Sequence, residues 1–348
     1  MMCDRIAGQR AVQVGGTRPW TRRGLKEERM ATAAERAGAV TKGATVGYGR
    51  YVYQHVPGWA RLPKGWEWAD CAGVAVDSKD RIYVYNRGPH PMMVFDTAGN
   101  LLSTWGEGIL RTAHHVFAAP DDTLYTTDIG DHTVRKWTTD GKLLMQLGKA
   151  NEPAEAMSGK PFNRPTDVTV APDGTLYITD GYGNARVHRY SADGKHLLSW
   201  GEPGTGPGQF KAPHGVRVSP DGQVYVVDRE NFRIQVFTED GQFIRQFMGV
   251  NRPDQVVFAP DGSLMIPELG FRAGLGAGAP PPGPMAPPAG IKFMTPMGQW
   301  LGGWGMSTDD PADLLCAHAV ALDSTGALYI GETLAAHRVQ KYVPVKQP

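Results

Sequence analysis

Short runs of alternating hydrophobic and polar residues recur along this chain in pairs, and each pair is joined by a turn rich in Pro, Asp and Gly. In HGVRVSPDGQVYVVD, residues 214–228, Val216 and Val218 alternate with other residues before the turn, and a second apolar run follows it. Alternation with a period of two predicts β-strands, and Asp-Gly supplies the backbone angles of a tight hairpin. The segment is therefore predicted to be an antiparallel hairpin that begins at His214.

The same pattern occurs six times. Each copy starts with what we call a lead residue and ends fourteen positions later at Asp, Glu or Asn; the copies are residues 72–86, 114–128, 166–180, 214–228, 254–268 and 318–332. Most copies continue into a second hairpin, so each unit has four short strands in roughly 40–50 residues, the signature of a propeller blade. We predict an all-β, six-bladed β-propeller. Its last blade has three strands of its own and takes its outer strand from residues 49–56.

Two segments fall outside the repeat. Residues 1–45 are basic and polar and are expected to form a poorly ordered N-terminal tail, which leaves residues 46–348 as a single propeller domain. Residues 269–291 are an insertion in blade five that is too rich in Pro and Gly for regular structure. The insertion is expected on the face that carries the lead residues, either as a lid or wall of a pocket lined by Phe271, or as an inert surface loop.

Composition narrows the classes of partner. The 348 residues include 44 Gly and 27 Pro, which suits a turn-rich β protein, and the formal net charge is +1. A charge so close to zero argues against nucleic acid or an anionic membrane as a partner, and no apolar run reaches the ~18 residues of a membrane span. Three widely spaced cysteines and no secretory signal lead us to expect a cytoplasmic protein without disulfides, as a monomer or weak oligomer.

Histidine occupies every second lead position. The six lead residues are Ala72, His114, Thr166, His214, Asp254 and His318. Alternate blades of a six-bladed ring are about 120° apart, so the three imidazoles are expected to converge on the central axis. Three imidazoles with one open position are typical of catalytic zinc, although imidazole also binds iron, cobalt and copper. The alternative for any one histidine is a hydrogen-bonded polar side chain at a channel mouth.

Residues just after the second strand of a repeat are expected on the same face as the lead residues, because that strand runs antiparallel to the first. Arg87 directly follows the first repeat and can hold a carboxylate in a bidentate grip. Tyr182 lies two residues after the third repeat, where nearby positive charge would favour the phenolate and allow it to act as a base. Packing of the tyrosine and ion pairing of the arginine are the alternatives. Further candidates for the pocket or for support of the ligands are Asp180, Arg229, Asp254, Phe271 and Cys316.

A set of short motifs gives this chain a family resemblance. The motifs PTDV, DGYGNAR, WGE, PGQF, PHGV and DREN lie within residues 162–237. Together they resemble the peptidyl-α-hydroxyglycine α-amidating lyases, within the wider NHL-repeat propellers, and the resemblance covers about residues 50–343.

The resemblance implies a site and a reaction. A zinc ion would be held by His114, His214 and His318, with Tyr182 and Arg87 as catalytic residues. The C–N bond of an α-hydroxyglycine amide would break to give an amide and glyoxylate. In this scheme zinc polarises the substrate, the tyrosine takes the hydroxyl proton, and the arginine binds the carboxylate.

Four departures from the family pattern qualify what the resemblance implies. Where the animal enzymes carry a methionine and a calcium-binding aspartate around the third histidine, this chain has Cys316 and Ala319, so a calcium site loses a carboxylate ligand. The cysteine is expected either to approach the metal or to serve as a small buried thiol. The family's disulfides are not expected, since Gly183 occupies one half-cystine position, and an attached copper monooxygenase domain is not expected either.

The leading functional hypothesis is a zinc-dependent lyase that cleaves the C–N bond of an α-hydroxyglycine-type amide or a related small carbinolamide. Its substrate is expected to be a small molecule or a short peptide-like compound. A metallo-hydrolase or hydratase that uses metal-bound water at the same site is the second hypothesis. The third is a non-catalytic NHL propeller that binds a protein partner.

Overall fold

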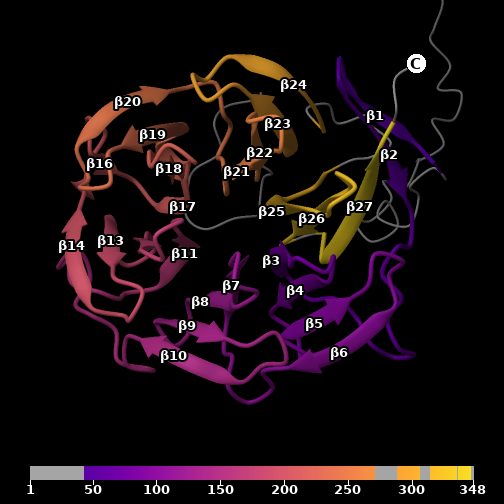
Figure 1. Ribbon diagram of the computed structural model, residues 1–348, viewed down its shortest axis with the longest axis horizontal. Coiled ribbons are helices and arrows are strands. Elements are labelled where there is room, and N and C mark those ends of the chain that lie inside the picture. The colour runs from indigo at the N-terminus through magenta and orange to yellow at the C-terminus, as the bar shows by residue number, and fades with distance from the viewer. Residues whose placement is uncertain (1–42, 271–287, 306–313, 335, 346–348) are drawn as a thin grey trace, which may run out of the picture.

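Six antiparallel sheets surround a central axis in the computed structural model shown in Figure 1. The structure describes residues 43–270, 288–305, 314–334 and 336–345. The predicted six-bladed β-propeller of NHL-repeat type is confirmed, and the sheets follow one another around the ring in the order of the sequence. No helix in the described ranges has the length and apolar character needed to cross a membrane.

Each of the first five blades is one sheet of four consecutive strands. Blade one has β3 (Cys71–Val76), β4 (Ile82–Asn86), β5 (Met92–Phe95) and β6 (Leu101–Trp105). Blade two has β7 (Ala113–Ala118), β8 (Leu124–Asp128), β9 (Thr133–Trp137) and β10 (Leu143–Leu147). Blade three has β11 (Pro165–Val170), β12 (Leu176–Asp180), β13 (Arg186–Tyr190) and β14 (His196–Trp200). Blade four has β17 (Pro213–Val218), β18 (Val224–Asp228), β19 (Arg233–Phe237) and β20 (Phe243–Phe247). Blade five has β21 (Val257–Phe258), β22 (Leu264–Glu268), β23 (Gly290–Met294) and β24 (Trp300–Trp304).

The sixth blade closes the ring as expected. It contains β25 (Ala317–Leu322), β26 (Leu328–Glu332) and β27 (Arg338–Pro344), and β2 (Tyr51–Val56) pairs with β27 to supply the outer strand. A further strand, β1 (Thr45–Tyr48), forms a hairpin with β2 and was not predicted. Its first residue is the last one assigned to the tail, and the expectation for residues 1–42 lies outside the described residues. Two short elements complete the fold, the parallel pair β15 (Glu202–Pro203) and β16 (Gln209–Phe210) and the 3-10 turn η1 (Arg229–Asn231).

The first hairpin of each blade depends on a left-handed residue in its turn. Gly174 and Gly222 take this position with φ of 85° and 83°, and Asp80 and Asp122 take it in blades one and two with φ of 57°. Glycine has no Cβ to oppose this conformation, and aspartate is one of the few other residues that tolerate it. The glycine or aspartate in each turn is therefore the physical reason why the sequence pattern predicts a hairpin.

Burial falls from the second strand of each blade to its outer edge. The second strands β4, β8, β12, β18, β22 and β26 are buried at every residue. The outer strands β6, β10, β14 and β20 are buried only at their last residue, which is Trp105 in blade one and Trp200 in blade three. This last side chain packs into the apolar layer between neighbouring blades. The burial of apolar surface between blades stabilises the ring, because each sheet has no other partner for its faces.

Blade five departs from the predicted pattern at its first strand. The sequence predicts a strand from residue 254, but β21 covers only Val257–Phe258. Continuing the register between β21 and β22 puts Pro267 opposite the start of the predicted strand, and Pro267 has no N–H group to donate to the ladder. The Asp254 N–H still donates to the Pro267 carbonyl at 3.0 Å, so the segment follows the sheet without forming a full strand. The insertion connects β22 to β23, and residues 290–291 of its predicted range belong to β23.

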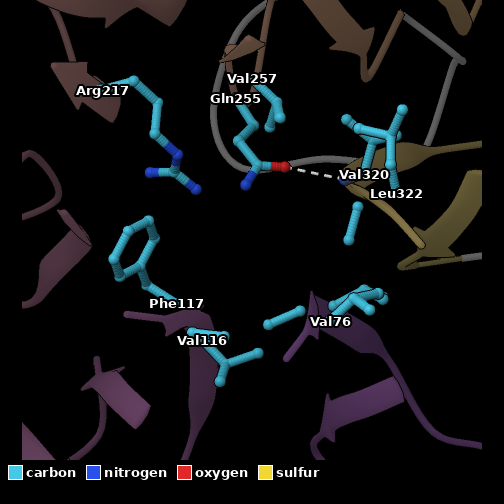
Figure 2. A pocket seen from close by; sticks show the side chains of 12 residues that line it. Val76, Val116, Phe117, Arg217, Gln255, Val257, Val320 and Leu322 are labelled. Atoms are coloured by element: carbon cyan, nitrogen blue, oxygen red, sulfur yellow. Dashed lines mark hydrogen bonds between the residues drawn. The ribbon is translucent and has the colours of Figure 1, made fainter. Parts of the chain in front are cut away.

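A buried ion-pair cluster lies next to the lead residues of blades two, three and four. Asp167 accepts from Arg217 at 2.8 Å and lies 2.9 Å from His115 Nε2. Burial acts to raise the pKa of Asp167, but Arg217 and His115 outweigh it and hold that pKa below its ordinary value. Arg217 also lines a cavity of about 170 Å³, which lies between the C-terminal ends of the first strands of the blades (Figure 2).

The cavity lined by Arg217 does not fit a calcium ion. Among its described lining residues there is no carboxylate, and the charged side chain is the cation Arg217. Ala319, where the family resemblance implies that a calcium-binding aspartate is lost, is fully buried and offers no side-chain oxygen. Calcium requires several oxygen ligands. The residues that line this cavity therefore do not offer the oxygen ligands of a calcium site.

Arg217→Met is expected to destabilise the propeller strongly. Removal of the guanidinium leaves the buried Asp167 carboxylate with only His115 as its ionic partner, and breaking a buried ion pair costs roughly 3–5 kcal/mol. The free energy of unfolding from urea titration measures the effect. Arg50→Met is the matched control, because Arg50 is 62% exposed in its ion pair with Asp261 and should change stability by less than about 1 kcal/mol. A loss of similar size in both variants would contradict the structural role of the cluster.

Candidate metal centre

The histidines converge on the axis because of a repeated irregularity in the inner strands. In blades one, two, three, four and six, the register between the first two strands shifts at the lead residue. His114, for example, lies between Ala113, which pairs with Asp128, and His115, which pairs with Thr127. A bulge of this kind re-aims one side chain out of the normal alternation. The lead residue is thus turned inward, and the next residue resumes the regular ladder.

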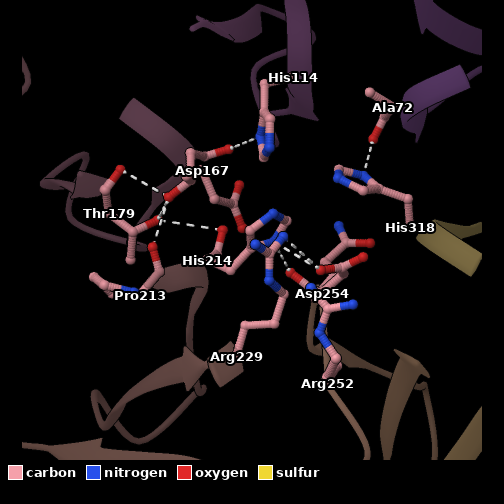
Figure 3. A network of polar contacts seen from close by, with 12 residues as sticks. Ala72, His114, Asp167, Thr179, Pro213, His214, Arg229, Arg252, Asp254 and His318 are labelled. Atoms are coloured by element: carbon pink, nitrogen blue, oxygen red, sulfur yellow. Dashed lines mark hydrogen bonds and ion pairs between the residues drawn. The ribbon is translucent and has the colours of Figure 1, made fainter. Parts of the chain in front are cut away.

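Each histidine is oriented by the lead residue of the following blade. The Nδ1 atoms of His114, His214 and His318 lie 2.6, 2.7 and 2.6 Å from backbone carbonyl oxygens. These oxygens belong to Thr166, Asp254 and Ala72, respectively. Figure 3 shows the three histidines around the axis, with the bond from His318 to Ala72 drawn as a dashed line. Because a carbonyl can only accept, Nδ1 carries the proton and the Nε2 lone pair is available as a ligand.

The three imidazoles form a group whose chemistry fits a transition-metal ion. They are buried, and their ligand atoms all lie within 4.8 Å of one another, which is close enough to share one cation. Burial lowers the pKa of all three histidines, helped by their mutual repulsion or by nearby arginines, and that of His318 falls to about 3. Neutral imidazoles are the form that binds metal. The prediction that these residues meet on the axis therefore agrees with the geometry.

Tyr182 reaches the same point from the loop that follows β12. Its hydroxyl lies 2.9 Å from His214 Nε2 and 3.1 Å from His114 Nε2. Gly181 permits this approach, because a Cβ at that position would lie 1.9 Å from the carbonyl oxygen of Pro213. Asp180 anchors the loop by accepting from the Asn163 backbone and the Asn184 side chain, so it supports the tyrosine from behind.

Arg229 is the arginine that contacts the phenol. Its Nη1 donates to the Tyr182 hydroxyl at 2.9 Å, and its guanidinium lies 5.2 Å from the centre of the phenol ring. Burial acts to lower the pKa of Arg229, but the attraction of Tyr182, Asp254 and Glu230 raises it overall, so the residue stays charged. The sequence placed Arg229 among the pocket candidates but not against the tyrosine.

Asp254 and Glu230 complete the charged surroundings. Asp254 Oδ1 lies 3.4 Å from both His214 Nδ1 and Arg229 Nη1, and burial raises the pKa of this carboxyl to about 7. Glu230 accepts from Arg229 at 2.9 Å and from Arg252 at 2.8 Å, and these two arginines hold the Glu230 pKa below its ordinary value against the effect of burial. Glu230 thereby joins blades four and five.

Arg87 directly follows β4 in blade one, whereas Arg229 directly follows β18 in blade four. The charge of Arg87 lowers the pKa of His114 and His318, which places it near both rings. The Arg87 Nη1 pairs with Asp70 at 2.8 Å and its Nε donates to the Ala113 carbonyl. The ion pair that the sequence analysis gave as the alternative role of Arg87 is thus present, and it orients the guanidinium. Arg87 Nη2 makes no hydrogen bond with the described residues.

A cavity of about 430 Å³ opens above the histidines. Its walls combine four arginines with apolar side chains; the described lining residues are Arg87, Ile129, Met157, Arg164, Gly181, Tyr182, Ala212, Arg229, Glu230, Arg252, Leu269, His318, Thr333 and Leu334. This volume suits a small molecule or the end of a short peptide. Leu269 places the start of the insertion at this mouth, whereas Phe271 lies outside the described residues.

The remaining candidates are distributed around this site. Cys316 is buried, its backbone N–H donates to Glu332, and its thiol is not part of the group of ligand atoms. Sequence reasoning missed Asp70, Arg164 and Arg252. The signal for the last two was available, because both arginines stand two residues before a lead residue.

The fold and the site together define a six-bladed NHL propeller with a three-histidine centre on its axis. The NHL repeat family model matches residues 162–190 and 210–237. Human NHL repeat-containing protein 3 is 32% identical over 314 residues, which cover 85% of each chain. The chain therefore belongs to the family of NHL repeat-containing protein 3.

The relatives also include amidating lyases, as the motifs predicted. Peptidyl-alpha-hydroxyglycine alpha-amidating lyase 1 of Drosophila melanogaster is 32% identical over 188 residues, which cover 49% of this chain and 34% of that protein. Among solved structures, a gluconolactonase from Xanthomonas campestris has a TM-score of 0.60 at 16% identity, covering 88% of this chain and 96% of that one. At this identity the likeness concerns the fold.

Proposed function

We propose that this protein is a zinc-dependent carbon–nitrogen lyase that cleaves an α-hydroxyglycine-type amide or a related small carbinolamide. The observation that carries the proposal is the position of the Tyr182 hydroxyl, within hydrogen-bond distance of two of the three axial histidines and of Arg229. An acid–base group, an anchored cation and a set of metal ligands thus meet at the floor of one cavity. The amidating lyases among the relatives supply the reaction class.

His114, His214 and His318 would hold the metal through their Nε2 atoms. When bound, zinc supplies Lewis-acid polarisation of a substrate oxygen. Arg87 binds the substrate carboxylate, because its pairing with Asp70 and Ala113 fixes the guanidinium at the rim of the site. The substrate is thereby oriented with its reacting carbon toward the phenol.

Tyr182 moves the protons. Arg229 donates to the phenolic oxygen and stabilises negative charge there, so the phenolate can take the proton of the substrate hydroxyl. The C–O bond becomes a carbonyl as the C–N bond breaks, and the electron pair of that bond goes to nitrogen. The same phenol then returns the proton to the departing nitrogen. The products are an amide and glyoxylate, and no water is consumed.

Release of glyoxylate from an N-acyl-α-hydroxyglycine by the zinc-loaded protein tests the proposal. We expect one glyoxylate and one amide for each substrate consumed, and loss of turnover after removal of the metal by a chelator. Solvent ¹⁸O distinguishes the lyase from a hydrolase, because hydrolysis of the acyl–nitrogen bond would place the label in a carboxylic acid product. An unreactive zinc-loaded protein, or ¹⁸O-labelled acid as the product, would overturn the proposal.

A further inference from the structure

Arg164 stands at the cavity without the ionic partner that its counterpart in the repeat has. It is an exposed residue two positions before the lead residue of blade three, and it lines the 430 Å³ cavity. Its guanidinium lies 5.2 Å from the centre of the Tyr182 ring, the same distance as that of Arg229. The Arg164 guanidinium therefore lies next to Tyr182, the residue that we assign to proton transfer.

The register of the repeat explains why this arginine differs from Arg252. Arg252 holds the equivalent position in blade five, where it is buried and pairs at 2.8 Å with Glu230 of the preceding blade. Glu230 follows the lead residue of blade four by sixteen positions. In blade two, which precedes Arg164, the residue at sixteen positions is Gly130. The place of the carboxylate is thus taken by a residue with no side chain.

The surplus positive charge of the cavity rests on this residue. Arg87 pairs with Asp70, and Arg252 pairs with Glu230. Arg229 contacts two carboxylates, Glu230 and Asp254. Within the described ranges Arg164 has no carboxylate within ion-pair distance, although it lines the same cavity. A dication on the histidines adds to the surplus. A substrate with a single carboxylate at Arg87 would leave the Arg164 charge uncompensated.

We infer that Arg164 binds a second anionic group, on the acyl side of the substrate, so that the preferred substrates are α-hydroxyglycine amides whose acyl part carries a carboxylate. This inference rests on the proposed function, because Arg87 is taken to hold the carboxylate of the hydroxyglycine part. Arg87 and Arg164 belong to alternate blades, one and three, which are about 120° apart around the axis. The two arginines therefore define two anion positions on either side of the reacting centre.

A matched pair of substrates tests the inference. N-glutaryl-α-hydroxyglycine carries a terminal carboxylate, and N-pentanoyl-α-hydroxyglycine has the same chain length without it. We expect kcat/KM of the wild-type protein to favour the glutaryl compound about tenfold, the size of one charge-assisted hydrogen bond at a partly exposed site. The ratio of the two kcat/KM values is expected to fall to about one in Arg164→Gln and to recover in part in Arg164→Lys.

Lys195→Gln is the control, since it removes one positive charge from the same blade at an exposed turn that is not part of the cavity lining. It should leave the ratio unchanged. Equal cleavage of both substrates by the wild-type protein, or a preference that survives in Arg164→Gln, would overturn the inference and leave the proposed function standing.

If neither compound is cleaved, the proposed function fails, and calorimetry on the zinc-loaded protein still decides on the anion position. Glutarate should then bind more tightly than pentanoate to the wild-type protein, and the difference should vanish in Arg164→Gln. Equal binding of the two acids by the wild-type protein would refute the anion position itself.

Discussion

Tyr182→Phe is expected to lower kcat for glyoxylate release by roughly 10²–10⁴-fold, the usual contribution of a positioned acid–base group. The substitution removes only the hydroxyl that lies 2.9 Å from His214 Nε2 and 2.9 Å from Arg229 Nη1. Because the metal ligands are imidazole nitrogens, the zinc content of the protein should stay at one ion per chain. Steady-state kinetics together with metal analysis of the same preparation measures both quantities.

Tyr48→Phe is the matched control for this experiment. Tyr48 is 65% exposed in the outermost strand of the closing blade and stacks on Trp300, far from the cavity lining. The control should keep the wild-type kcat and the wild-type zinc content. A Tyr182→Phe protein that retained more than about a tenth of the wild-type kcat would remove this residue from the proton transfers.

His214→Ala is expected to abolish both metal binding and turnover. The variant leaves two imidazoles, and the loss in affinity should exceed the roughly 10–100-fold cost of removing an outer-shell partner of a metal ligand. Zinc per chain after dialysis against a weak chelator measures the loss, and circular dichroism confirms that the sheets remain. His196→Ala is the control, because His196 is an exposed residue of β14 that bonds to Ser199. Full zinc content in His214→Ala would rule out the axial site.

The blades and the axial histidines could be predicted because both depend on a fixed repeat length. Fourteen positions separate each lead residue from the Asp, Glu or Asn that closes its repeat, so the register identifies His114 and not His115 as the inward residue of blade two. The structure agrees, since His114 belongs to the three-histidine group and His115 lies in the ion-pair cluster below it. A repeat supplies spatial equivalence without any knowledge of long-range contacts.

The partners of the arginines could not be predicted in the same way. Arg229 reaches the Tyr182 hydroxyl through the turn η1, and Arg87 meets Asp70 from the segment before blade one. These contacts depend on how far each loop turns over the mouth of the channel, which a period of two in the strands does not specify. The shortening of β21 at its start was not predicted for a different reason, because a single proline on the facing strand removes one ladder donor.

The orientation of each histidine by the next blade links the number of blades to the number of metal ligands. Blades two, four and six supply an imidazole, and blades three, five and one supply the carbonyl that fixes its tautomer. The ring thus consists of three two-blade units, and in each unit one blade supplies the imidazole and the next supplies the carbonyl that orients it. An odd-numbered ring built on the same rule would leave one unit incomplete. Gain or loss of a single blade would therefore cost the metal site even if the ring itself closed.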